Sequence, residues 1–471
     1  MSARYRWTTI GSFALIFLGA FEALAVTTVM PRISEDLDGE ALYSAAFSIT
    51  LAASVVGMVV AGGWSDRRGP TAPLITAIAV FIGGLLLSGT ALDMVVFLVG
   101  RLLQGLGSGA VGVALYVVVA RIYPAALHPR IFGLFAAAWV LPSLVGPPVA
   151  GFVADTISWH WVFLGVAVLA VGFGGLVIPA LLQLRGTGVD VAPEAGALSK
   201  YWQVVLAIVV AIGVVTISIS GESSGLITVI VAAFAFVVVV SAVRPLVPRG
   251  TLVVSRGLPS VVLLRGILAA AFFSTEVYLP YLLIDRYGLP SAIAGLILTI
   301  GAVSWAVGSA AQSRLDPVMS AEKILAVGAL FLAVGLAGQF LSVLLTLPLW
   351  VIGTTWLIAG AGMGLTFPRI STLALAYSTP SNQGFNSAAV QIMDATGGAT
   401  AIAVAGLIFG AAGAASGNGF LASFAFSAAV ALLTVPVALR TVPRAPRVGP
   451  AVGQDAVRAA ASSAAESEPA L

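Results

Sequence analysis

Cysteine is absent from the 471-residue sequence, and histidine occurs only twice, at His128 and His160. Without cysteine the chain can form neither a disulfide nor a thiolate metal site, and two histidines near predicted helix ends do not make a metal cluster. Charged residues are also scarce, at 9%, where a soluble domain carries about 25%. We therefore expect no bound metal and no cofactor, and the composition excludes an ordinary water-soluble globular protein.

Hydrophobic residues make up 59% of the chain, and they gather in runs of about 20 residues, the length at which a helix crosses the core of a bilayer. Alternating segments of about 10 residues, typical of membrane β-barrels, are missing. The first run is too long for a signal peptide, so we expect it to be retained. The predicted fold class is an all-α polytopic membrane protein. Its fourteen spans are predicted at residues 9–30, 41–63, 72–92, 95–121, 130–153, 159–183, 203–220, 224–243, 259–284, 291–311, 322–344, 347–375, 384–411 and 418–440.

The basic residues predict the orientation. With the N-terminus in the cytoplasm, 17 of the 22 Lys and Arg residues fall in cytoplasmic segments, two in outer loops and three inside spans. Because Lys and Arg concentrate in the cytoplasmic loops of membrane proteins, both termini are predicted to lie inside. From residue 441 the chain is rich in Pro, Ala and Ser without an apolar face, which predicts a disordered cytoplasmic tail.

Two parts of the chain resemble each other. The segment GLGSG begins at Gly105 and GAGMG begins at Gly360, 255 residues later, while Glu22 and Glu276 are 254 residues apart. Two six-helix repeats about an axis normal to the membrane are a known transporter plan, with the substrate site between them. The predicted domains are an N-terminal six-helix bundle at 1–183, a central segment with two inserted helices at 184–258, a C-terminal six-helix bundle at 259–440, and the tail at 441–471.

Three motifs carry a family resemblance. GGWSDRRGPT follows the second span, RLLQGLGSGAVG lies in the fourth and WVLPSLVGPPVAG in the fifth. With fourteen spans in a six-two-six order, these motifs resemble the major facilitator superfamily, in particular its fourteen-helix drug:proton antiporter branch (QacA/EmrB type). The third motif is typical of exporters in that family. The sequence departs from the family pattern at Pro70 and Thr71, where two basic residues are usual.

The first and third motifs imply gating roles. The implied gating residues are Gly62, Asp66, Arg67, Gly69, Gly146, Pro147 and Gly151. The resemblance implies that Asp66 faces the start of span 13, where unpaired N–H groups favour an anion, and latches the inner gate when the protein faces outward. The glycines allow helices to approach closely, and Pro147 bends its helix. The alternatives are a solvated turn aspartate and ordinary helix packing.

Six charged residues lie within predicted spans, where each costs about 2.5–3.5 kcal/mol on insertion scales and is a functional hypothesis by default. They are Glu22, Arg101, Arg265, Glu276, Arg369 and Asp394. Glu22 and Arg101 both lie about 21 Å from the inner surface, so they can meet directly or through water. A carboxyl balanced between burial and a nearby guanidinium can change protonation when a cavity opens. We hypothesise that Glu22 carries the coupling proton and Arg101 tunes it; a static ion pair is the alternative.

The thirteenth span has one polar helical face, formed by Ser387, Gln391, Asp394 and Gly398. Asp394 lies about 15 Å deep and is a second candidate for proton or cation binding, with an interhelical hydrogen bond as the alternative. In span 9, Arg265 and Glu276 share a face about 16 Å apart along the axis, too far to pair with each other. Arg369 is expected close to the inner surface, where its side chain can reach the headgroups.

The repeat suggests a division of labour. At the 255-residue offset Arg101 corresponds to Trp356, so we expect the first half to handle the proton and the second to offer aromatic surface to the substrate. The predicted substrate-cavity residues are Trp139, Phe272, Glu276, Trp305, Trp356 and Gln391, with Phe273 and Tyr278 as further aromatic candidates. Lipid-facing packing is the alternative for each ring. The six membrane charges sum to zero, so the sequence does not demand a cationic substrate.

These observations predict a proton-coupled exporter, an antiporter of amphipathic small molecules such as drugs, that acts by alternating access as a monomer in a bacterial plasma membrane. Its expected partners are protons, its substrate and lipid, without nucleic acid. No enzymatic activity is expected, and the absence of a GxxxxGK[ST] loop argues against a nucleotide. A symporter that imports a nutrient is one alternative, which GPPVAG disfavours by resemblance. A non-transporting sensor or scaffold is another, and it leaves the membrane charges unexplained.

Overall fold

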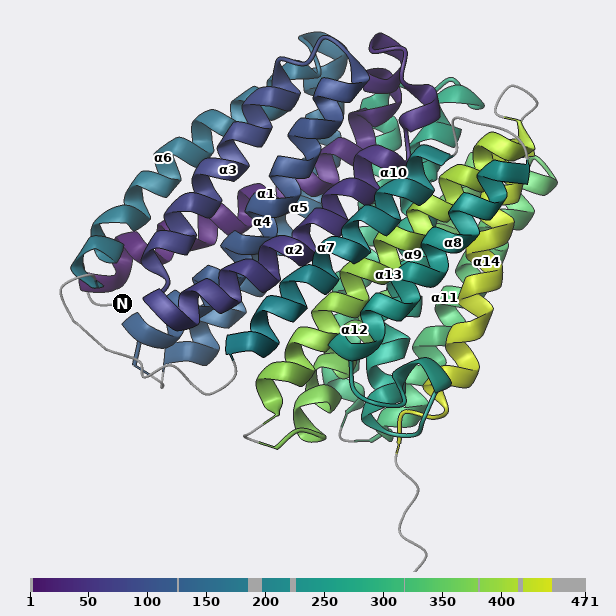
Figure 1. The fold of residues 1–471 in the computed structure, drawn as a ribbon. Helices are drawn as coiled ribbons and strands as arrows, with labels where there is room; N and C mark the ends of the chain where they lie inside the picture. The colour runs from purple at the N-terminus through teal and green to yellow at the C-terminus, as the bar shows by residue number, and fades with distance from the viewer. Residues whose placement is uncertain are drawn as a thin grey trace, which may run out of the picture.

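The computed structural model describes residues 3–124, 127–184, 197–220, 226–316, 318–379, 382–413 and 418–442. Every regular element in these ranges is helical (Figure 1). The long helices are α1 (Ala3–Asp36), α2 (Ala45–Arg68), α3 (Thr71–Gly89), α4 (Met94–Ile122), α5 (His128–Thr156), α6 (His160–Leu184), α7 (Ala197–Ile219), α8 (Leu226–Val243), α9 (Leu258–Asp285), α10 (Ser291–Leu315), α11 (Ala321–Leu344), α12 (Leu349–Ala376), α13 (Gln383–Ala412) and α14 (Asn418–Ala438). Short 3-10 helices are η1 (Glu40–Leu42), η4 (Arg244–Leu246) and η5 (Thr251–Val253).

All fourteen long helices are apolar and long enough to cross a bilayer, which confirms the predicted number of spans and the fold class. Apart from residues 441 and 442, the predicted tail lies outside the described residues. Polar residues mark where helices begin: the Asp93 carboxylate accepts a hydrogen bond from the first turn of α4, and the Ser320 hydroxyl does the same for α11. Between α2 and α3 the chain turns at Gly69, whose φ of 77° favours glycine.

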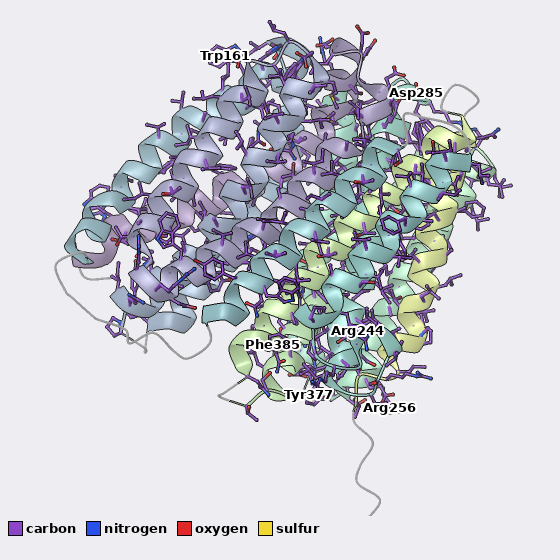
Figure 2. The ribbon with its side chains drawn as sticks, viewed as in Figure 1. Trp161, Arg244, Arg256, Asp285, Tyr377 and Phe385 are labelled. Carbon is purple, nitrogen blue, oxygen red and sulfur yellow. The ribbon has the colours of Figure 1, made fainter. Side chains whose placement is uncertain are left out.

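Charged and aromatic side chains mark the two ends of the molecule. In Figure 2, Arg244 and Arg256 lie at one end with Tyr377, whereas Asp285 and Trp161 lie at the other. We call the end with the arginines the inner end, in keeping with the predicted orientation, and the opposite end the outer end. Between them the helices present mostly apolar side chains outward, as contact with lipid acyl chains requires.

Close glycine contacts recur in the two halves of the chain. In the first half, Gly105 of α4 lies against the backbone of Thr50 in α2; in the second, Gly360 of α12 lies against Gly301 in α10. The sequence shift is 255 residues from α4 to α12 and 251 residues from α2 to α10. The same two shifts relate the pairs Gly57–Leu106 and Gly308–Ala361, and the pairs Phe81–Gly107 and Leu332–Gly362. The internal repeat is therefore visible in the packing, because small residues set the helix spacing at matching points.

The two inserted helices lie on one side of the molecule. Helix α7 packs against α2 and α13, while α8 packs mainly against α7. A hydrogen bond of 2.6 Å joins the hydroxyls of Ser48 in α2 and Ser218 in α7, both buried. Much of α8 is exposed and apolar, as in Phe234 and Ile227. Helix α7 is thus attached to both halves, and α8 covers α7 on the peripheral, lipid-facing side (Figure 1).

The two halves meet along two junctions, α5 with α10 and α2 with α13. At the first, Gly151 of α5 lies against the backbone of Ala292 near the start of α10. At the second, Ser44 at the start of α2 lies against Gly406 near the end of α13. Both contacts lie near the outer end, and the ribbons of the two halves spread apart toward the inner end (Figure 1). The arrangement corresponds to a conformation that is closed at the outer end.

The glycine contacts predict a difference in stability between two substitutions in α4. We expect Gly105→Val to lower the free energy of unfolding by about 1–3 kcal/mol, because the added side chain would meet the backbone of Thr50. Gly112→Val is the matched control, since no atom lies within 4 Å of a side chain added there. Thermal unfolding of both variants in detergent measures the difference. Equal melting temperatures would contradict the role assigned to close helix packing.

Candidate functional site

Glu22 of α1 and Arg101 of α4 form an ion pair in the interior of the first half. Their side chains are 4% and 2% exposed, respectively. The equal depths predicted from the sequence therefore correspond to a direct contact, and the predicted meeting is confirmed. A pair this buried is stabilising only when the remaining hydrogen-bonding groups are also satisfied.

The guanidinium of Arg101 has further partners that supply this condition. Its Nε donates to the carbonyl of Ala46 in α2 at 3.0 Å, and one Nη donates to the Gln104 side-chain oxygen at 2.5 Å. The Gln104 amide donates in turn to the hydroxyl of Ser88 in α3 at 2.8 Å and to the carbonyl of Gly84 at 3.1 Å. One network thus connects α1, α2, α3 and α4. Gln104 belongs to the RLLQGLGSGAVG motif of the fourth span, whereas no pattern in the sequence pointed to a role for Ser88.

A second ion pair joins Arg265 of α9 to Asp394 of α13. The two guanidinium–carboxylate hydrogen bonds measure 2.9 and 3.2 Å, and the Arg265 guanidinium lies 3.5 Å from the ring centroid of Phe367 in α12. Asp394 is 24% exposed, so this pair is more accessible than the first. The sequence identified both residues and excluded a pair between Arg265 and Glu276, but it did not predict this partner, because only the tertiary structure brings α9 beside α13.

Arg369 also has a partner. It pairs with Asp316, which follows α10 near the inner end, at 2.5 Å. The predicted position near the inner surface is consistent with this, but the side chain is 17% exposed and bound to a carboxylate rather than simply extended toward the headgroups. Arg369 therefore links the inner ends of α10 and α12.

The polar face predicted for span 13 is present on α13. Ser387 and Gln391 are exposed, Asp394 is partly exposed, and Gly398 is buried against Phe273 and α2. The face is thus open toward the inner end and closed at Gly398. It offers an amide and a carboxylate at the depth where a transported molecule passes.

The predicted aromatic residues are placed differently from one another. Phe272 and Trp356 stack with their ring centroids 4.6 Å apart and are 2% and 1% exposed. In this conformation they belong to the packed core of the second half, because Gly301 leaves room for the Trp356 indole. Trp305 is partly exposed and contacts Phe272 edge-on at 5.4 Å, and Trp139 is 54% exposed on α5.

The gating motif after the second span lies at the inner end. Arg67 donates from Nε to the carbonyl of Gly63 at 2.9 Å, and its guanidinium lies 5.4 Å from the Tyr201 ring of α7. Gly62 is partly buried, and Asp66 is exposed. The latch between Asp66 and α13 belongs to the outward-facing form, so it stays a prediction.

The third motif forms the outer junction between α5 and α10. Gly146 lies near the ring of Phe21 in α1, while Pro147 lies against Gly295 of α10. At the end of α5, the Asp155 carboxylate accepts a hydrogen bond of 3.2 Å from the N–H of Ala292 in the first turn of α10, where an anion is favoured. The close packing predicted for this motif therefore occurs between the halves.

A cluster of aromatic rings closes the outer end, and sequence reasoning missed it. The Tyr43 hydroxyl donates to the carbonyl of Val277 in α9 at 2.7 Å. The Tyr43 ring lies 5.5 Å from Tyr278 and 4.9 Å from Tyr281 of α9, and both of these contact Phe409 of α13. Tyr278 was predicted as a cavity residue, but it is buried in this outer cluster. The rings span the two halves and exclude water where they meet.

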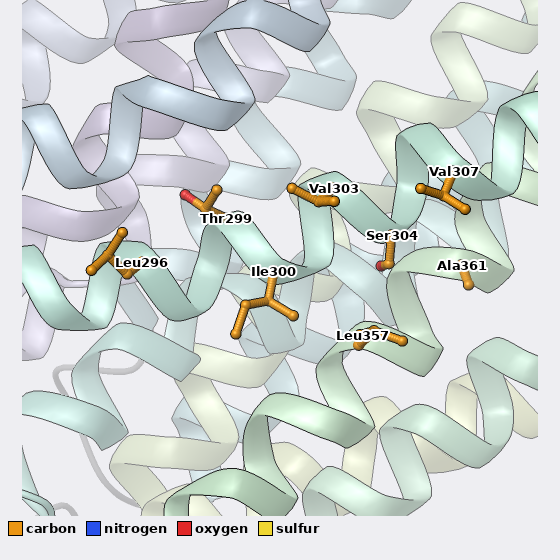
Figure 3. Close-up of a pocket in the computed structure, with 8 residues that line it drawn as sticks. All are labelled: Leu296, Thr299, Ile300, Val303, Ser304, Val307, Leu357 and Ala361. Atoms are coloured by element: carbon orange, nitrogen blue, oxygen red, sulfur yellow. The ribbon is translucent and has the colours of Figure 1, made fainter.

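An apolar groove lies on the lipid-facing surface of the second half (Figure 3). It follows α10 and is bordered on one side by α12. Its lining residues are Leu296, Thr299, Ile300, Val303, Ser304, Val307, Leu357 and Ala361. The shift of 251 residues that relates α2 to α10 makes Thr299 the counterpart of Ser48. In the first half, α7 covers Ser48. The equivalent surface on α10 has no inserted helix over it among the described residues.

Comparison with known proteins gives a family match and similar bacterial proteins. A family model described as Major Facilitator Superfamily matches residues 12–402. The protein named Probable multidrug-efflux transporter Rv1634, from Mycobacterium tuberculosis, is 26% identical over 418 residues, covering 86% of this chain and 88% of that protein. Multidrug transporter protein MdtP from Bacillus subtilis is 26% identical over 434 residues, covering 85% of this chain and 74% of that protein.

Solved structures share the fold at lower sequence identity. A D-xylose-proton symporter superimposes with a TM-score of 0.66 at 14% identity, covering 94% of this chain and 98% of that one. A POT family transporter in complex with 5-aminolevulinic acid has the same TM-score and identity, covering 92% and 96%. At such identity the likeness concerns the arrangement of helices alone.

The outer cluster predicts a shift in the conformational equilibrium. We expect Tyr43→Phe to favour outward opening by about 2- to 10-fold, because it removes one buried hydrogen bond between the halves. The chain has no cysteine, so Leu51→Cys near the centre can report access to a water-soluble thiol reagent added from outside. Tyr201→Phe, which removes an exposed hydroxyl, is the control. Unchanged labelling in Tyr43→Phe would argue against a gating role.

Proposed function

Because the chain belongs to the Major Facilitator Superfamily, we propose that it exports amphipathic small molecules from a bacterial cell in exchange for protons. Export is supported by the names of the two bacterial relatives, both of which are described as multidrug transporters. The exporter-type motif in α5 supports the same direction of transport. We further propose that the protein acts as a monomer in the plasma membrane and carries out no covalent chemistry.

The observation that carries proton coupling is the position of Glu22. Its carboxylate lies inside the membrane-spanning part, paired with Arg101 and almost completely buried. An ionisable group at this depth is costly and typical of proton relays. If the movement of the halves admits water to the pair, Glu22 takes up a proton when Arg101, still bonded to Ala46 and Gln104, releases it. Glu22 and the conformational change are then coupled through one guanidinium.

The way in which the halves are built supports alternating access. Within each half, glycines bring helix backbones into contact, so each half can move as a rigid unit. Between the halves, the outer ends are joined by the Tyr43 cluster and by Asp155 at the start of α10. Outward opening must separate these contacts, and the Asp66 latch at the inner end would replace them. Asp394 and Gln391 lie on the face that an internal substrate meets first.

Glu22→Gln tests this proposal directly. In proteoliposomes with an imposed proton gradient, we expect the variant to lose proton movement linked to substrate exchange, because glutamine keeps the shape of the side chain but cannot carry a proton. Glu35→Gln, at an exposed acidic residue near the outer end, is the control and should transport normally. A pH-sensitive dye inside the vesicles measures the proton flux, and a fluorescent amphipathic substrate measures transport.

If Glu22→Gln still acidified its vesicles during substrate exchange as the unaltered protein does, Glu22 would not carry the coupling proton. If the unaltered protein moved its substrate without any proton flux, the antiport mechanism itself would be wrong. Uptake together with protons, in place of exchange, would favour a symporter.

A further inference from the structure

The segment that connects α8 to α9, residues 244–257, presents a basic surface. Its exposed basic residues are Arg244, Arg249 and Arg256. Figure 2 shows Arg244 and Arg256 at the inner end of the molecule. The chain has no acidic residue from 223 to 275, and the next one, Glu276, is partly exposed about 27 Å along α9. No acid near in sequence therefore neutralises this segment.

A closed turn holds two of the arginines close together. The N–H of Ser255 donates to the carbonyl of Gly250 at 3.1 Å, so the chain leaves the turn beside the point at which it entered. Arg249 and Arg256 are the next residues outside this hydrogen bond, and both lie at the base of the turn. The N–H and the hydroxyl of Ser260 in α9 donate to the Ser255 carbonyl at 3.1 and 2.7 Å. The turn is thus fixed to the start of α9.

The end of α14 adds a fourth arginine to this surface. The N–H of Gly257 donates to the carbonyl of Arg440 at 2.9 Å, which places Arg440 near Arg256, just before α9. Arg440 is exposed as well. The ion pairs among the described residues involve none of these four arginines. Their charges are therefore available to an external anion.

The tip of the turn is apolar and faces outward. Leu252 is 37% exposed and Val253 is 75% exposed, and both lie in η5. The next residue, Val254, has a φ of 54°, a left-handed conformation that is rare for a β-branched residue. Backbone strain of this kind persists where the surrounding structure enforces it, and it is often found at functional sites. The turn therefore holds two apolar side chains away from the protein at the cost of a strained backbone.

We propose that this turn binds an anionic phospholipid of the inner leaflet. The segment connects two membrane-spanning helices through short 3-10 helices, so it lies at the level of the headgroups. Arg249 and Arg256 bind the headgroup phosphate, for which the planar guanidinium is well suited. Leu252 and Val253 lie among the upper parts of the acyl chains. The site is separate from the substrate path and from proton coupling, so it goes beyond the proposed export function.

Two features distinguish this site from the general positive charge of the inner end. First, a free phosphate ion would satisfy the arginines but leave Leu252 and Val253 in water, whereas a lipid satisfies both. Second, other basic residues at this end have acids beside them in the sequence: Lys323 follows Glu322, and Arg314 lies two residues before Asp316. Anionic lipids attract basic segments next to membrane spans, and the attraction is strongest where no acid opposes it.

Lipid binding to the full-length protein in detergent tests the assignment. Native mass spectrometry measures the binding of phosphatidylglycerol and of phosphatidylcholine with the same acyl chains. We expect Arg249→Gln combined with Arg256→Gln to weaken phosphatidylglycerol binding by about tenfold or more, because two charges near the headgroup are lost. Arg249→Lys combined with Arg256→Lys keeps the charge and should retain most of the binding.

Arg314→Gln combined with Lys323→Gln is the matched control, since it removes the same charge from exposed residues at the same end. We expect this control to weaken phosphatidylglycerol binding by less than about twofold. Equal weakening in the two glutamine pairs would reduce the effect to a diffuse attraction and overturn the site. Displacement of the lipid by inorganic phosphate at equal concentration would also overturn it, because the turn would then recognise phosphate alone.

The position of the apolar tip is measured separately. Because the chain has no cysteine, Val253→Cys can carry a single bimane label in nanodiscs that contain phosphatidylglycerol. We expect nitroxide groups on the lipid acyl chains to quench this label more strongly than a label at Lys323→Cys. Equal quenching at the two positions would show that the tip remains in water and would refute its insertion among the lipids.

Discussion

The low polarity of the membrane interior is the constraint on which this structure depends. A charged group there must find an opposite charge, a hydrogen-bond network or a ligand, because water is not available to solvate it. The Glu22–Arg101 pair meets this demand with the carbonyl of Ala46 and the amide of Gln104. The result ties four helices of the first half into one unit. Polar contacts of this kind position the helices as well as satisfying the charge.

The second half answers the same constraint in another way. Its ion pair between Arg265 and Asp394 lies closer to the inner end, is more exposed, and is completed by the ring of Phe367. Its interior is otherwise built from stacked rings, with Phe272 on Trp356. Two halves with matching helix patterns thus differ in chemistry. The interior of the first is polar and buried, and that of the second is aromatic and partly exposed. In the proposed function, the polar first half would hold the proton and the aromatic second half the apolar molecule.

The sequence predicted what depends on a single helix. Fourteen spans follow from the length of apolar runs, and the depth of Glu22 and Arg101 follows from the rise per residue. The polar face of α13 follows from helical periodicity. The sequence did not predict partners that depend on which helices are neighbours, namely Asp394 for Arg265 and Asp316 for Arg369. Nor did it predict that Phe272 and Trp356 would be buried, since the space for the indole is created by Gly301 on a different helix.

The inserted helix α7 makes the two sides of the transporter mechanically unequal. It contacts α2 through the Ser48–Ser218 hydroxyl pair and also packs on α13, whereas the corresponding surface of α10 carries an open apolar groove. On the first side, a movement of one half relative to the other displaces α7 against α2 or α13, and α7 is hydrogen-bonded to α2. On the second side, α5 and α10 are in direct contact, and no inserted helix covers the groove on α10 among the described residues. The α2 and α13 junction therefore moves with an additional helix attached to it, whereas the α5 and α10 junction moves without one.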